Sequence, residues 1–130
     1  MIQDIIRIGD VDFEFTGIYR GFFGIYLSKQ VSRKGYAWVN INAALEDFKI
    51  DFNIPDDYIL VNLTKEIAED IMSIGYNMSR KCIYWLDAIC DDYRSAAYNS
   101  IRGGSIGDYY ICAKYYIVPA ALVPTNMMEA

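Results

Sequence analysis

The chain has 130 residues, of which 54% are apolar, 15% aromatic and 22% charged, and its formal net charge is −5. A chain of this length corresponds to one domain that can fold without a disulfide or a metal. It contains no histidine, which excludes Ser-His-Asp and Cys-His catalysis and histidine metal sites. The acidic N-terminal sequence does not resemble a signal peptide, and no apolar run is long enough to span a membrane. We therefore expect a cytoplasmic protein without a membrane segment.

The negative charge is concentrated in the middle of the chain. Residues 46–92 carry eleven acids and four bases, whereas residues 1–45 and residues 93–130 each carry one net positive charge. Such a negative field repels nucleic-acid phosphates and attracts basic surfaces. The same acids could instead form a solvated exterior that keeps the protein soluble. The sequence leaves both interpretations open.

The first third of the chain is predicted to form a β-meander. VDFEF, residues 11–15, alternates apolar and acidic residues, which is typical of a half-buried strand. The glycine-broken GFFGIYLS and the alternating YAWVNIN continue the strand pattern over residues 21–42. Trp38 falls on the polar side of its segment, so it lies either under a loop or at a surface for a partner. The register of residues 42–53 stays ambiguous between a helical turn and a strand.

A short central strand, YILVNL, and two consecutive helices are predicted next, the helices over about residues 64–76 and 79–99. Thr64 is a good N-cap, and Glu66 complements the dipole of the first helix. In the second helix one apolar stripe would run at steps of one, three and four. This stripe consists of Cys82, Ile83, Leu86, Ile89, Cys90, Tyr93 and Ala97. Cysteines on such a stripe are expected to be buried core thiols.

A last strand is predicted over residues 109–118, ended by Pro119, with a loose tail over residues 119–130. The order of the elements predicts an α+β fold for residues 1–118. It would be an antiparallel sheet of about five to six strands, with an N-terminal meander and both helices packed on one face.

Acidic residues of the second predicted helix form the main candidate site. Asp87 and Asp91 lie four residues apart, with Asp92 beside them. Paired carboxylates can bind Mg²⁺ or act as acid and base, but the same spacing occurs on solvated faces and on contact surfaces. The glycine-rich RGGSIGD follows a helix, the reverse of the order found in phosphate-binding loops. We therefore expect no cofactor and no metal.

Residues 85–96, WLDAICDDYRSA, resemble the first-helix signature of the KlcA/ArdB antirestriction family, with its Trp, Asp, Cys, acidic and Tyr-Arg positions. The resemblance covers about a dozen positions, and that family's helix lies near its N-terminus. It implies a helix here and an antirestriction activity. No site residue is transferred from it.

These features favour a small non-enzymatic protein that inhibits a partner protein by covering its basic, nucleic-acid-binding surface. Phage- or plasmid-encoded anti-defence proteins, of the anti-CRISPR or antirestriction type, and toxin immunity proteins fit this description. The protein itself would not bind nucleic acid. The expected contact residues are Glu69, Asp70, Asp87, Asp91 and Asp92, with Tyr84, Trp85 and Trp38 as aromatic anchors.

Two other functions remain open. One is a secretion-chaperone-like or phage assembly module that acts as a homodimer. The other is a histidine-free enzyme that uses Asp87 and Asp91 with a divalent ion. The sequence does not distinguish a monomer from a homodimer.

Overall fold

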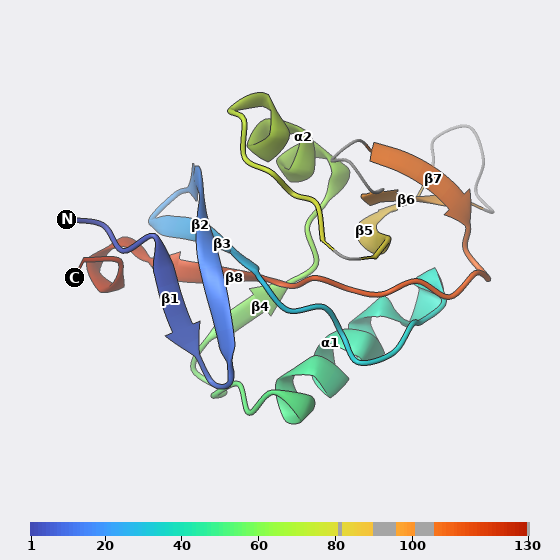
Figure 1. Cartoon of the computed structure of the whole chain (residues 1–130), viewed down its shortest axis with the longest axis horizontal. Helices are drawn as coiled ribbons and strands as arrows, with labels where there is room; N and C mark the ends of the chain where they lie inside the picture. The colour runs from blue at the N-terminus through green and yellow to red at the C-terminus, as the bar shows by residue number, and fades with distance from the viewer. Residues whose placement is uncertain (81, 90–95, 101–105, 130) are drawn as a thin grey trace.

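The computed structural model describes residues 1–80, 82–89, 96–100 and 106–129, which form two antiparallel sheets and two α-helices (Figure 1). The α+β class is therefore confirmed, and so is an N-terminal meander within residues 5–28. The strand predicted for YAWVNIN is wrong, because residues 38–40 form a 3-10 helix and an α-helix begins at residue 41. The five-stranded sheet has the order β1 (Ile5–Ile8), β2 (Val11–Arg20), β3 (Phe23–Ser28), β8 (Ala120–Pro124), β4 (Ile59–Val61). The three-stranded sheet has the order β5 (Tyr84–Ile89), β6 (Ala96–Ser100), β7 (Ile106–Tyr110). The helices are α1 (Ile41–Asp51) and α2 (Lys65–Ser73).

Both helices have the local sequence signals that a helix needs. The Thr64 hydroxyl accepts a hydrogen bond from the Ile67 amide (3.3 Å) and caps α2, as predicted. In α1 the buried residues Ile41, Ala44 and Phe48 follow helical spacing. The ambiguous segment of residues 42–53 is therefore helical as far as Asp51.

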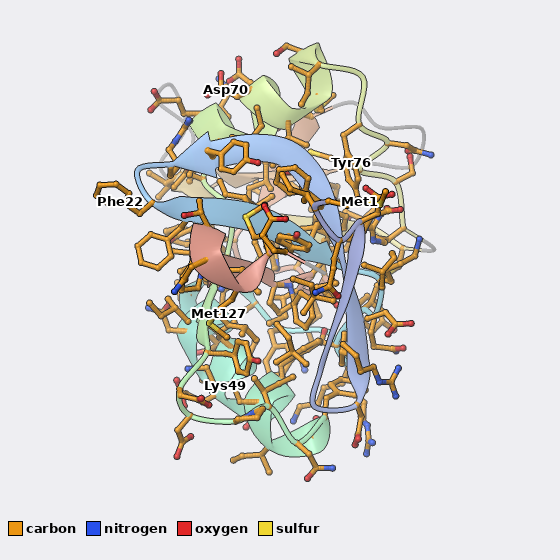
Figure 2. The ribbon with its side chains drawn as sticks, turned by 90° about the vertical axis from the view of Figure 1, so that its left-hand side faces the viewer. Met1, Phe22, Lys49, Asp70, Tyr76 and Met127 are labelled. Atoms are coloured by element: carbon orange, nitrogen blue, oxygen red, sulfur yellow. The ribbon has the colours of Figure 1, made fainter. Side chains whose placement is uncertain are left out.

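The two helices cover opposite faces of the five-stranded sheet. The expectation of two helices on one face, over residues 64–76 and 79–99, is wrong, because only the first of that pair is a helix and the other helix, α1, lies earlier in the chain. Tyr26 and Ala121 share a core with α1, whereas Leu27 and Ala120 share a second core with α2. Successive strand residues point to opposite faces, and β3 and β8 carry apolar residues on both. In Figure 2, Asp70 of α2 and Lys49 of α1 lie at opposite ends of the molecule.

The helix predicted over residues 79–99 is wrong, because residues 84–89 and 96–100 are the strands β5 and β6. Tyr84, Trp85 and Leu86 are all buried, with Trp85 in one core and its two neighbours in the other. When a strand is buried on both faces, its consecutive residues are all apolar, so apolar residues also occur at helical spacing without any helix. The resemblance to an antirestriction helix therefore does not extend to the structure of residues 84–89. Residues 81 and 90–95 lie outside the described residues.

The loose tail expected over residues 119–130 is also wrong, since residues 120–124 form β8 inside the sheet, between β3 and β4. The strand predicted over residues 109–118 is wrong as well, because β7 ends at Tyr110 and residues 111–118 form only isolated bridges. Pro119 does not prevent pairing, because its carbonyl accepts a hydrogen bond from the Ser28 amide (2.9 Å). The segment before Pro119, residues 111–118, runs from the three-stranded sheet to the five-stranded sheet. Its Tyr115 exchanges backbone hydrogen bonds with Tyr36, and its Tyr116 carbonyl accepts one from the Trp85 amide (2.9 Å).

A cluster of polar side chains fastens the chain after α2 to the five-stranded sheet. The Tyr76 hydroxyl donates to Glu14 Oε1 (2.8 Å) and accepts from Arg80 Nη2 (3.0 Å). Arg80 Nε in turn donates to the Ser28 carbonyl (2.9 Å). Burial is the largest cause that raises the pKa of Tyr76, to about 12. These bonds fix the position of α2 over β2 and β3.

The hairpin between β1 and β2 depends on a glycine that approaches the end of α1 closely. Gly9 has φ +58°, and a Cβ there would lie 2.4 Å from the Asn53 carbonyl oxygen. Gly21 has a similar φ of +60° but open space around it. We expect Gly9→Ala to lower the free energy of unfolding by roughly 1–3 kcal/mol more than Gly21→Ala, because only Gly9→Ala adds a backbone clash. Urea denaturation of both variants measures the difference, and equal losses would contradict the close approach.

The raised pKa of Tyr76 predicts a stability change at alkaline pH. In the unfolded chain the tyrosine loses its proton near the ordinary pKa of 10.0, whereas in the folded protein it keeps the proton up to a pKa of about 12. Stability from this group is complete below pH 10 and is lost as the pH rises from 10 to 12. We expect the free energy of unfolding to fall less steeply over this range in Tyr76→Phe. Identical slopes in the two proteins would show that Tyr76 is not protected.

Candidate functional site

Two hollows adjoin each other between α2 and β5, and both are lined by Thr64. The acidic hollow has a volume of about 440 Å³ and is lined by Thr64, Lys65, Glu66, Glu69, Asp70, Ala88 and Ile89. The apolar hollow has a volume of about 320 Å³ and is lined by Arg20, Ile25, Val61, Asn62, Leu63, Thr64, Ile67, Asp87 and Leu122. We call the two together the α2–β5 groove.

The local sequence explains how the groove forms. α2 places its buried residues Ala68 and Ile71 on the sheet, which leaves Glu66, Glu69 and Asp70 on the side away from the core. β5 leaves the core after Leu86, so that Asp87 is exposed. The Asp87 amide donates to the Leu63 carbonyl (2.8 Å), which holds β5 beside the segment that leads into α2. Carboxylates from two distant parts of the chain thus line one groove.

Four carboxylates and two cations line the groove, so its formal charge is negative. Asp70 Oδ2 lies 2.6 Å from Arg20 Nη2, and Glu69 Oε1 lies 3.6 Å from Lys65 Nζ. Glu66 and Asp87 form no ion pair within the described residues. Both are exposed. Among the described residues, these two carboxylates are therefore the charges of the groove that no ion pair compensates.

The structure brings together three of the acids proposed from the sequence. Glu69 and Asp70 line the acidic hollow, and Asp87 lines the apolar hollow beside it. Asp87 reaches the groove from a strand and not from the predicted helix. Asp91 and Asp92 lie outside the described residues.

The aromatic candidates lie elsewhere. Tyr84 and Trp85 are each 1% exposed and belong to the two cores. The Tyr84 hydroxyl donates to the Met78 carbonyl (2.6 Å), and Trp85 Nε1 donates to the Tyr36 carbonyl (2.7 Å). Trp38 is half-buried and donates from Nε1 to the Leu86 carbonyl (3.0 Å). The polar tip of each ring is satisfied inside the protein. Tyr84 and Trp85 are core residues without an exposed face, whereas Trp38 keeps part of its surface exposed.

Most of the groove residues are not among the site residues that the sequence indicates, and three of them carry charge or apolar contact that matters for binding: Arg20, Glu66 and Ile67. Arg20 comes from β2, and nothing in its surroundings in the sequence predicts its ion pair with Asp70, 50 positions away. The sequence assigns Ile67 to the amphipathic pattern of α2, and it assigns Glu66 to the helix dipole or to the ligands of a possible metal site, but to no contact surface. Their place in the first turn of a capped helix was the available signal.

A third hollow, of about 380 Å³, is basic and is lined by Lys29, Gln30, Val31, Ser79 and Arg80. Both of its cationic side chains already have partners within the protein. Arg80 donates to the carbonyls of Ser28 and Ser79, and Lys29 Nζ lies 3.6 Å from Glu14 Oε1. This hollow therefore belongs to the structural cluster around Tyr76.

The two described cysteines, Cys82 and Cys112, are free thiols. Cys82 is half-buried, and its burial raises the pKa of the thiol above the ordinary value, which disfavours the nucleophilic thiolate. Cys112 is exposed, and Cys90 lies outside the described residues. Within residues 1–80, 82–89, 96–100 and 106–129, no three acidic or cysteine side chains are grouped so that they could hold a metal ion.

Neither of the two helices described is long and apolar enough to cross a membrane. No known protein family, no curated protein and no solved structure matches this chain.

Proposed function

We propose that this is a non-enzymatic binding protein that inhibits a partner protein by docking the α2–β5 groove onto a basic surface. The observation that carries the proposal is the pair of uncompensated carboxylates, Glu66 and Asp87, on the two sides of a groove with an apolar floor. Charged rims around apolar centres are typical of protein interfaces.

Electrostatic attraction and apolar contact would have separate roles in this binding. The net charge of −5 and the acids of the groove would steer a cationic partner and raise the association rate. Contact with the apolar hollow, where Ile67 and Leu122 are half-buried, would slow dissociation. Asp91 and Asp92 follow β5 in the sequence and remain candidate contacts.

A nuclease or another nucleic-acid-binding effector is the kind of partner that presents such a basic surface. Covering that surface would block its nucleic acid by steric exclusion and charge competition. An anti-defence protein of a phage or plasmid, or a toxin immunity protein, would act in this way. The proposal requires no catalytic group and no cofactor.

Charge reversal of the groove tests the proposal. We expect the tagged wild-type protein to capture a basic protein from cells that carry its gene, with an affinity that falls as salt rises. Glu66→Lys/Asp87→Lys should weaken the isolated pair at least about tenfold, because it replaces two attractive charges with repulsive ones. Calorimetry or surface plasmon resonance measures this change, and the captured partner should lose nucleic-acid binding when the wild-type protein is added.

The matched control is Asp4→Lys/Asp56→Lys, which makes the same change in net charge at two exposed acids outside the groove. Thermal unfolding confirms that both double variants are folded. The proposal fails if the control loses as much affinity as the groove variant, or if the partner is not basic.

A homodimeric assembly or chaperone module is the second candidate, favoured by an exposed apolar row on the outer side of α1. Val39, in the turn that leads into α1, is 64% exposed and Ile50 is 76% exposed, with Ala43 exposed between them. Their spacing places them on one side of the helix. Two copies of α1 packed antiparallel about a two-fold axis would bring Val39 of one copy against Ile50 of the other.

Self-association through α1 predicts a concentration-dependent dimer. We expect Ile50→Lys to abolish it, because the substitution places a charge in the apolar row, while Lys49→Gln on the same helix leaves it intact. Sedimentation velocity measures the species present. A wild-type protein that stays monomeric at high concentration would eliminate this candidate.

A further inference from the structure

We propose that the apolar hollow receives one arginine side chain of the partner, whose aliphatic stem contacts the hollow and whose guanidinium binds Asp87. This inference rests on the proposed function, because it names the group that anchors the basic partner. It goes beyond that function by assigning a site for a single side chain.

The walls of the hollow fit an aliphatic stem. Its floor contains Ile25 and Leu63, which are 0% and 2% exposed, and its sides contain the half-buried Val61, Ile67 and Leu122. Its volume of about 320 Å³ is at the lower end of the range for ligand pockets. A single long side chain suits this size better than a larger ligand.

The charges at the mouth favour a cation over an anion. Arg20 is already neutralised by Asp70, with Nη2 and Oδ2 2.6 Å apart. Asp87 is exposed and has no ion pair within the described part of the chain. An anionic ligand would compete with Asp70 for Arg20 and would be repelled by Asp87. A neutral apolar ligand would desolvate the Asp87 carboxylate without replacing the lost hydrogen bonds.

Arginine fits these conditions better than lysine. Its planar guanidinium offers five donors and pairs with a carboxylate through two parallel hydrogen bonds, whereas an ammonium acts as a point charge. Arginine is also more weakly hydrated, and it is enriched at the centres of interfaces. Asp87 at the rim would bind the guanidinium of an arginine, and the apolar wall below it would contact the aliphatic part of the same side chain.

Three small probes with similar stems and different heads test this inference: n-butylguanidinium, n-butanol and n-butyrate. Each is titrated into the full chain while the methyl resonances of Val61, Ile67 and Leu122 are followed by NMR. We expect n-butylguanidinium to shift these resonances saturably, with a dissociation constant in about the millimolar range for so few atoms. The other two probes should bind at least about tenfold more weakly.

Asp87→Asn should weaken n-butylguanidinium binding about tenfold, whereas Asp108→Asn, at an exposed strand aspartate outside the hollow, should leave it unchanged. The inference is overturned if the methyl resonances do not shift, if butanol or butyrate binds as well, or if Asp87→Asn has no effect.

The probe titration does not depend on any partner, so the two proposals can fail separately. If the probe does not bind but groove reversal still abolishes capture of a basic protein, only the arginine site is wrong. If the probe binds and no basic partner is captured, the hollow is a guanidinium site and the proposed inhibition is wrong.

Discussion

The antiparallel pairing of β3 with β8 is the interaction on which the rest of the structure depends. It places Tyr26 opposite Ala121 and Leu27 opposite Ala120. Because successive strand residues point to opposite faces, this one pair supplies a core to α1 on one side and to α2 on the other. The small, fully buried Ala120 and Ala121 leave room for the larger side chains that the helices contribute.

The same pairing forms the floor of the α2–β5 groove. Ile25 of β3 lies opposite Leu122 of β8, and both line the apolar hollow. α2 covers part of this face, and β5 is held beside it by the bond from Asp87 to Leu63. The uncovered remainder is apolar and carries Asp87 at its edge. Because α2 and β5 leave part of this sheet face uncovered, the groove combines acidic side chains with an apolar surface.

The crossing segment before β8 explains why Tyr84 and Trp85 are buried. Ile117 reaches the α1 core and Val118 reaches the α2 core, so the segment joins both. Tyr84 and Trp85 pack where it meets β5, and backbone carbonyls accept hydrogen bonds from their polar tips. A chain rich in tyrosine and tryptophan can thus use these rings as core residues with satisfied donors.

The sequence by itself determined the α+β class, the strand character of residues 5–28, the capped helix after Thr64 and the acidic charge of the middle third. These features depend on alternation, capping and composition, which act over a few residues. Only the tertiary structure decided that residues 84–89 form a strand, that residues 120–124 enter the sheet and that Arg20, Glu66 and Asp87 share a groove. A short apolar run has no periodicity that distinguishes helix from strand. The pairing of Ile25 with Leu122 joins positions so far apart that no local pattern encodes it.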